Sequence, residues 1–164
     1  MDLTEKGLNL IKSYEELRLK AYDDFQPNKI LTGNTQIKGT LTVGYGSTAK
    51  WIRWNTIIDE NKANELLLED IAVAEKRIKQ MNLIKRELTP NEYSACVSFV
   101  FNCGGGYIDK QKKWTPYELW NWINENRPNI KDKWLITAIT SKGKRMNGLI
   151  NRRLAEVELY LSKL

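Results

Sequence analysis

The sequence predicts an α+β fold that combines a small antiparallel β lobe with a mainly helical lobe. Glycine, proline and asparagine interrupt residues 23–39 repeatedly, and residues 41–47 then alternate between apolar and small side chains, as in a short strand. The segments before and after this region carry apolar residues at helical spacing. We therefore expect one domain over 1–164, with a β lobe at about 21–48 and a helical lobe comprising about 56–164 and the N-terminal helix.

Capping signals mark the ends of the first helices. Asp2 and Glu5 are spaced as in a capping box, and the helix that they introduce should end near Tyr14–Leu17. Apolar residues at helical spacing then predict a long helix from about Glu60.

Two similar tetrapeptides predict the starts of later helices. Thr89-Pro90-Asn91-Glu92 combines a threonine cap, a proline at the first helical position and a glutamate that closes the box, and its helix should end at Gly104-Gly105-Gly106. Thr115-Pro116-Tyr117-Glu118 repeats the pattern and predicts a tryptophan-rich helix to about Asn126. A last helix is expected along the apolar stripe of Ile150, Leu154, Val157 and Leu161.

The composition limits the chemistry that the chain can perform. It contains no histidine, which excludes a Ser-His-Asp triad, a Cys-His peptidase and an HExxH zinc site. We expect neither a metal nor another cofactor. Cys96 and Cys103 would lie roughly 10 Å apart on one helix, too far for a disulfide, so both are predicted to be buried apolar residues.

The net charge of +6 favours an anionic partner. Nucleic acid, acidic lipid and the bacterial wall all fit this charge, which does not choose among them. Basic residues are densest from Lys142 to Arg153, where a solvated helix face is an equally good interpretation.

Two acidic residues near the start of the β lobe are candidates for catalysis. Glu15 is expected at the end of the first helix and Asp24 just after the following turn, so their carboxyl groups can face each other across a cleft. Glycoside hydrolysis needs such a pair, one as a proton donor and one to assist water or attack carbon. Spacing alone does not distinguish these two residues, or their neighbours Glu16 and Asp23, from solvated surface charges.

Four blocks of sequence, in the same order, resemble the phage-type lysozymes of glycoside hydrolase family 24. In that family a glutamate ends the first helix and precedes a Leu-Arg-Leu-x-x-Tyr-x-Asp run, and a Thr-Ile-Gly-Tyr-Gly strand follows. The resemblance extends over nearly the whole chain. The matching blocks are Glu15–Asp24, Leu41–Thr48, Leu88–Gly104, and Gly148–Arg153 with Glu156.

The resemblance implies a lysozyme-like fold and a muramidase. Such an enzyme hydrolyses the β-1,4 bond between N-acetylmuramic acid and N-acetylglucosamine in bacterial peptidoglycan. Glu15 matches the general acid of the family, Asp24 the second carboxylate, and Thr42 the hydroxyl that helps to hold the attacking water. Members of this kind invert the configuration of the sugar, which suits a bound water better than direct attack.

Tyr22 sets the register of the match, so that the second of two adjacent aspartates aligns with the family's carboxylate. Seventeen residues separate Asp24 from Thr42, where the family often has five, so the assignment of Thr42 is less firmly supported. Glu16 and Ser47 replace a glycine and a histidine that the family often has.

Phe101 and Asn102 match family positions that line the cleft, and Thr48, just after the predicted strand, is a third candidate for substrate contact. Core packing explains Phe101 equally well. Arg152 and Arg153 can bring a cation to Glu15, and for one of them a solvated helix face is an equally good interpretation. Trp51 and Trp54 can offer an aromatic platform for sugars, although half-buried packing is the preferred interpretation.

Two other functions remain open. A lytic transglycosylase would cleave the same polymer and leave anhydro-muramoyl ends, and a non-catalytic basic module would only bind the wall. Chitin is a further candidate substrate. We expect a monomer that acts on bacterial peptidoglycan, binds no nucleic acid and does not insert into a membrane. With no visible signal peptide, the protein is expected in the host cytoplasm until its release to the wall, or alternatively on the virion.

Overall fold

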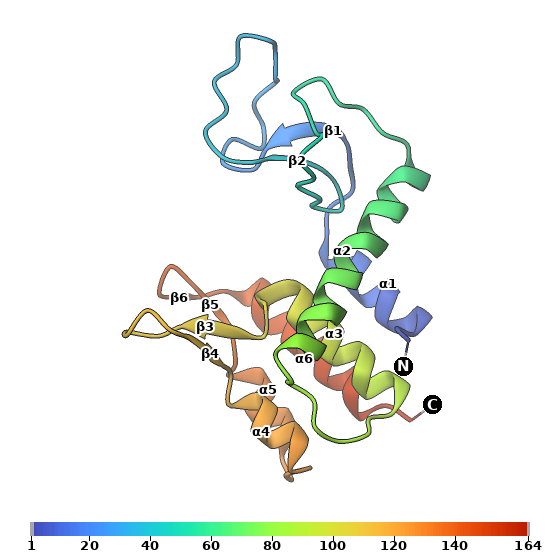
Figure 1. The fold of residues 1–164 in the computed structure, drawn as a ribbon, viewed down its shortest axis with the longest axis vertical. Helices are drawn as coiled ribbons and strands as arrows, with labels where there is room; N and C mark the ends of the chain where they lie inside the picture. The colour runs from blue at the N-terminus through green and yellow to red at the C-terminus, as the bar shows by residue number, and fades with distance from the viewer. Residues whose placement is uncertain (1, 164) are drawn as a thin grey trace. The chain divides into compact units, whose positions relative to one another are not determined.

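The computed structural model describes residues 2–163, and contacts within the chain divide it into two compact units (Figure 1). Unit 1 comprises the residues up to Ile11 and those from Val73, and unit 2 comprises Lys12–Ala72. Helices are combined with two-stranded antiparallel sheets, which confirms the predicted α+β class. No helix within residues 2–163 has the length and apolar character needed to cross a membrane.

Unit 2 contains the predicted antiparallel sheet. Strand β1 (Arg18–Asp23) pairs with β2 (Leu41–Gly44), and the long loop of residues 24–40 joins them (Figure 1, blue to cyan). Tyr22 lies opposite Thr42 in the pairing. Buried apolar side chains from the sheet, the following turns and helix α2 (Glu60–Gln80) form the core of this unit: Ala21, Val43, Ile52 and Leu66.

Helix α1 (Glu5–Tyr14) ends where it was expected but begins with a different cap. The Thr4 hydroxyl accepts a hydrogen bond from the Gly7 amide at 3.1 Å, and the Thr4 carbonyl accepts one from Leu8 at 2.9 Å. The prediction of Asp2 as the cap is therefore wrong. The Thr4 amide also donates to the Ser94 hydroxyl at 2.9 Å, which favours Thr4 at this position.

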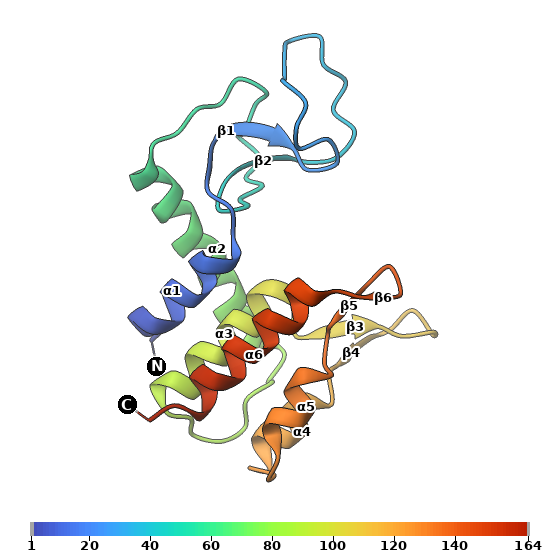
Figure 2. The same cartoon turned by 180° about the vertical axis from the view of Figure 1, so that it is seen from behind.

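Helices α3 (Pro90–Cys103) and α6 (Asn147–Leu161) lie side by side in unit 1 (Figures 1 and 2). The capping box that was predicted at the start of α3 is present, with Thr89 and Glu92 bonding to each other's backbone amides. Gly104 ends the helix in the left-handed conformation, with φ of 74°, as expected. The predicted last helix is confirmed as α6.

The prediction of a helix start at Thr115 is wrong. Thr115 lies in β4 (Trp114–Pro116), which pairs with β3 (Gly106–Ile108), and helix α4 (Leu119–Asn124) begins only after Glu118. The physical reason is Asp109. Its carboxylate accepts hydrogen bonds from the amides of Gln111 and Lys113 and from the Thr115 hydroxyl, so the threonine closes a hairpin instead of a helix.

The remaining elements of unit 1 are short and were not predicted. Helix α5 (Ile130–Leu135) packs against α4 and α6, and β5 (Thr140–Ser141) pairs with β6 (Lys144–Arg145). Figure 2 shows this second hairpin, which lies between α5 and α6 in the sequence. The core contains Phe99, whose ring meets three aromatic rings edge-on at centroid distances of 5.7 to 5.9 Å: Tyr117, Trp120 and Trp134.

Both cysteines are free, as expected. Cys96 is completely buried, and burial raises the pKa of its thiol. Cys103 is half-buried, and its thiol donates to the Phe99 carbonyl at 3.0 Å.

Candidate active site

Glu15 follows directly after the last residue of α1. Its amide donates to the Lys12 carbonyl at 3.2 Å, which closes the end of the helix, and its side chain is half-buried. The carboxylate lies near the turn after β2, because a Cβ placed on Gly46 would be 4.0 Å from Glu15 Oε2. Gly46 has φ of 97°, a conformation that favours glycine, so this turn brings bare backbone toward the acid.

Asp23 is completely buried and serves as an anchor for the loop. Four donors surround its carboxylate at 2.7 to 3.0 Å: the amides of Phe25, Lys38 and Gly39, and the side chain of Gln26. Burial alone would raise the pKa of Asp23, but these hydrogen bonds favour the charged form and lower the pKa to about 2. Asp23 therefore stays ionised and is used for structure.

Asp24 has the opposite environment, because its side chain is exposed. One carboxylate oxygen, Oδ1, accepts a hydrogen bond from the Thr40 amide at 2.6 Å, and the Asp24 amide donates to the Thr40 carbonyl at 3.1 Å. These two bonds hold Asp24 at a defined position just beyond the end of β1. Its carboxylate remains within reach of solvent and of a ligand.

Thr42 is buried on β2, opposite Tyr22. Its hydroxyl donates to the Thr40 carbonyl at 3.1 Å, which leaves the oxygen lone pairs as acceptors. Cross-strand partners share one face of a two-stranded ribbon, as do alternate residues along a strand. Tyr22 and Thr42 therefore project from the same face, and Asp24 follows directly after the last residue of β1.

Tyr22 lies among the charges of this region. Burial raises the pKa of Tyr22. The guanidinium of Arg18, which lies 4.5 Å from the centre of the ring, lowers this pKa, and the carboxylates of Glu16, Asp24 and Glu15 raise it. The charges of Glu15 and Asp24 thus act on the phenol of Tyr22, and Thr42 lies opposite Tyr22 in the sheet, all within unit 2.

The predicted substrate-contacting residues fall in both units. Thr48 is exposed in the segment after β2. In unit 1, Phe101 is half-buried, with the Arg152 guanidinium 6.0 Å from its ring centre. The Asn102 side-chain carbonyl accepts a hydrogen bond from Arg153 at 2.7 Å.

The interpretation of Arg152 and Arg153 as part of a solvated helix face is wrong, because both are buried. Their partner is Glu156, one turn further along α6 and itself completely buried. Arg153 Nη2 donates to Glu156 Oε1 at 2.9 Å, and Ser98 and Trp134 donate to the same carboxylate at 2.9 and 3.1 Å. The cluster links α3, α5 and α6. Because α3 lies far from the other two helices in the sequence, this role could not be predicted from the sequence.

Sequence reasoning also missed the hydrogen bond between Ser47 and Asp70. Ser47 replaces the family's histidine and is buried, and its backbone pairs with Val43 at 2.9 and 3.0 Å. Its hydroxyl donates to Asp70 on α2. Burial raises the pKa of Asp70, whereas this hydrogen bond lowers it. The contact ties the turn that carries Gly46 to α2. In the sequence, nothing distinguishes Asp70 from other acidic residues of the predicted helix.

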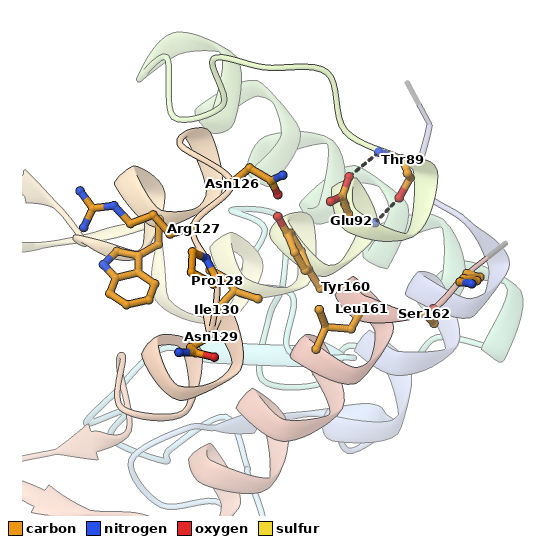
Figure 3. Close-up of a pocket in the computed structure, with 12 residues that line it drawn as sticks. Thr89, Glu92, Asn126, Arg127, Pro128, Asn129, Ile130, Tyr160, Leu161 and Ser162 are labelled. Atoms are coloured by element: carbon orange, nitrogen blue, oxygen red, sulfur yellow. Dashed lines mark hydrogen bonds between the residues drawn. The ribbon is translucent and has the colours of Figure 1, made fainter.

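A cavity of about 560 Å³ in unit 1 contains none of the predicted site residues (Figure 3). Glu92 lines it, but Arg86 and the Thr89 amide already bind its carboxylate. Figure 3 shows the capping box at its edge. A cavity of about 730 Å³ in unit 2 has Tyr22 in its lining and so adjoins the trio. Within residues 2–163, no three Asp, Glu or Cys side chains form a cluster suited to a metal ion.

Comparison with known proteins agrees with the sequence resemblance. The model of the phage lysozyme family matches residues 12–156. The endolysin of Acyrthosiphon pisum secondary endosymbiont phage 1 is 33% identical, with 99% of both chains covered. The endolysin of Bacillus phage B103 is 32% identical over 99% of this chain and 55% of its own length, so the chain spans about half of that relative.

A solved structure supports the same relationship. The endolysin of Escherichia coli O157:H7 phage FAHEc1 superimposes with a TM-score of 0.71 at 30% identity, covering 98% of this chain and 94% of that one. The resemblance to phage-type lysozymes that the four blocks indicated is therefore confirmed.

Proposed function

Because the chain belongs to the phage lysozyme family, we propose that it is a muramidase that hydrolyses the β-1,4 bond between N-acetylmuramic acid and N-acetylglucosamine in peptidoglycan. The observation that carries this proposal is the grouping around Tyr22. A half-buried carboxyl group, an exposed carboxylate and a hydroxyl oxygen free to accept come from three successive segments of unit 2.

Glu15 acts as the general acid. It donates its proton to the glycosidic oxygen as the bond from that oxygen to the anomeric carbon breaks. Its carboxyl group is half-buried beside the Gly46 turn, where the backbone carries no side chain.

Asp24 and Thr42 activate a water molecule on the other side of the sugar ring. Asp24 takes one proton of the water while the Thr42 oxygen accepts a hydrogen bond from the other. The water oxygen bonds to the anomeric carbon and inverts its configuration. The hydrogen bonds of Asp24 and Thr42 to Thr40 hold both groups in place before the substrate binds.

The test compares wall lysis by Glu15→Gln and Glu16→Gln. Glutamine keeps the shape of Glu15 but cannot donate the proton, so activity should fall by ~100-fold or more. Glu16 is an exposed neighbour paired with Arg18 at 3.2 Å, and its variant should keep most of the activity. Full activity in Glu15→Gln would contradict the mechanism, and full binding without any lysis by the unaltered chain would identify a wall-binding module.

A further inference from the structure

The loop of residues 24–40, longer than the family usually has, is held firmly against unit 2. Asp23 anchors it near both ends through the amides of Phe25, Lys38 and Gly39. The Arg18 guanidinium donates to the Pro27 carbonyl at 2.6 Å. A loop with so many fixed points presents a preformed surface, which lowers the entropic cost of binding a ligand.

The middle of this loop lies over Trp54. A Cβ placed on Gly33 would be 3.5 Å from the tryptophan ring, and a turn closed by Thr32 and Thr35 at 2.8 Å holds Gly33 there. Trp54 remains 44% exposed, so the ring is only partly covered. It is not part of a helix; its buried part fits the expected half-buried packing, and its exposed part is open to a ligand.

The loop, strand β1 and the segment that carries Trp54 enclose the cavity of about 730 Å³, which we call the loop groove. Three basic residues line it, Arg18, Lys20 and Lys29, and no lining residue is acidic. Glu16 neutralises Arg18 at 3.2 Å, whereas both lysines are exposed to solvent. The groove therefore offers two lysine cations, two aromatic rings (Tyr22 and Trp54) and the amide side chains of two asparagines.

We propose that the loop groove is an accessory binding site for a carboxylate-bearing glycan strand of peptidoglycan. The face of Trp54 packs on a sugar ring, and Lys20 and Lys29 pair with the carboxylates that the lactyl group and the peptide stem carry. The identity of this ligand rests on the proposed function. Glu15, Asp24 and Thr42 do not line the loop groove. Tyr22 lines the groove and is acted on by the charges of Glu15 and Asp24, so a glycan strand held in the groove would adjoin the proposed catalytic site.

The experiment measures binding separately from cleavage. The full-length chain carrying Glu15→Gln is sedimented with purified sacculi, from which hydrofluoric acid has removed phosphodiester-linked polymers. Adding Trp54→Ala should weaken binding about 5-fold or more, the usual scale for an exposed aromatic anchor. Adding Lys29→Ala should weaken it less, and the loss should disappear at high salt.

Matched controls come from the same segment. Trp51 is 46% exposed but does not line the groove, and Lys50 is likewise exposed outside it, so Trp51→Ala and Lys50→Ala should bind like the parent. Equal losses in Trp51→Ala and Trp54→Ala would overturn the proposal, as would unchanged binding in both Trp54→Ala and Lys29→Ala. Binding that depends on the acid-labile polymers would assign the groove to a phosphate polymer instead.

These outcomes are independent of catalysis. If the unaltered chain fails to cleave walls while Trp54→Ala still reduces binding, the proposed function is wrong but the loop groove is still a binding site. Unfolding temperatures of all variants show whether a loss of binding comes from a loss of fold, and Lys29→Ala, on the exposed side of the loop, provides a variant with little risk of misfolding.

Discussion

Asp23 and Asp24 show how far two identical neighbours can differ. The position of Tyr22 in the motif was enough to predict that Asp24 belongs to the candidate site. Nothing in the local sequence shows that Asp23 is buried, because its donors at Lys38 and Gly39 come from the far end of the loop. The sequence was enough to propose the residues of the trio, whereas the hydrogen bonds of Asp23 depend on distant parts of the chain.

Asp24→Asn should abolish most of the activity and leave stability nearly unchanged. A neutral amide neither takes a proton from water nor stabilises positive charge on the sugar ring, so wall lysis should fall by ~100-fold or more. The side chain is exposed, and the amide oxygen can still accept from Thr40. Turbidity of wall suspensions gives the rate and urea unfolding gives the stability; an active Asp24→Asn would exclude Asp24 from water activation.

Among the elements, one of three predicted helix caps, that of α3, was correct. The capping box at Thr89 and the glycine at the end of α3 appear as expected, because both motifs bond within a few residues. Thr115 carries the same letters but bonds to Asp109 in a hairpin. A competing contact within the hairpin thus overrides the capping signal, and the structure shows which of the two threonines caps a helix.

The cap of α3 can be tested by stability alone. Thr89→Ala removes the hydroxyl that accepts from the Glu92 amide at 3.2 Å and should lower the free energy of unfolding by about 1 kcal/mol. Thr89→Ser keeps the hydroxyl and should lose much less. Thermal unfolding measures both variants, and equal stabilities would show that the box contributes nothing to α3.

The loop anchor makes unit 2 sensitive to acid. The folded-state pKa of Asp23 is about 2, below the ordinary value of 3.8, so its contribution to stability is complete above pH 3.8 and is lost as the pH falls toward 2. Asp23→Asn should be less stable than the parent at neutral pH, and this difference should shrink over that interval. Urea unfolding between pH 2 and pH 6 measures the difference.

Asp24→Asn is the control for this titration, since Asp24 is exposed and makes a single side-chain hydrogen bond among the described contacts. A stability difference between the parent and Asp23→Asn that stays constant down to pH 2 would contradict the assignment of Asp23 as an ionised anchor.

For the whole molecule, the net charge of +6 predicts attraction to the anionic wall. Lysis of walls should slow as ionic strength rises, because salt screens exposed charges beyond roughly 10 Å at 0.1 M. Cleavage of a short uncharged chito-oligosaccharide is the reference. Equal salt effects on both substrates would mean that long-range attraction does not limit the rate.

The proposed mechanism requires that water attacks peptidoglycan at the muramic acid side of the glycosidic bond. The most direct measurement is mass spectrometry of muropeptides released from purified sacculi in oxygen-18-labelled water. Hydrolysis should give reducing muramic acid ends that carry one labelled oxygen from the attacking water. Unlabelled anhydro-muramoyl ends, lighter than the reducing ends by one water molecule, would contradict it and identify a lytic transglycosylase.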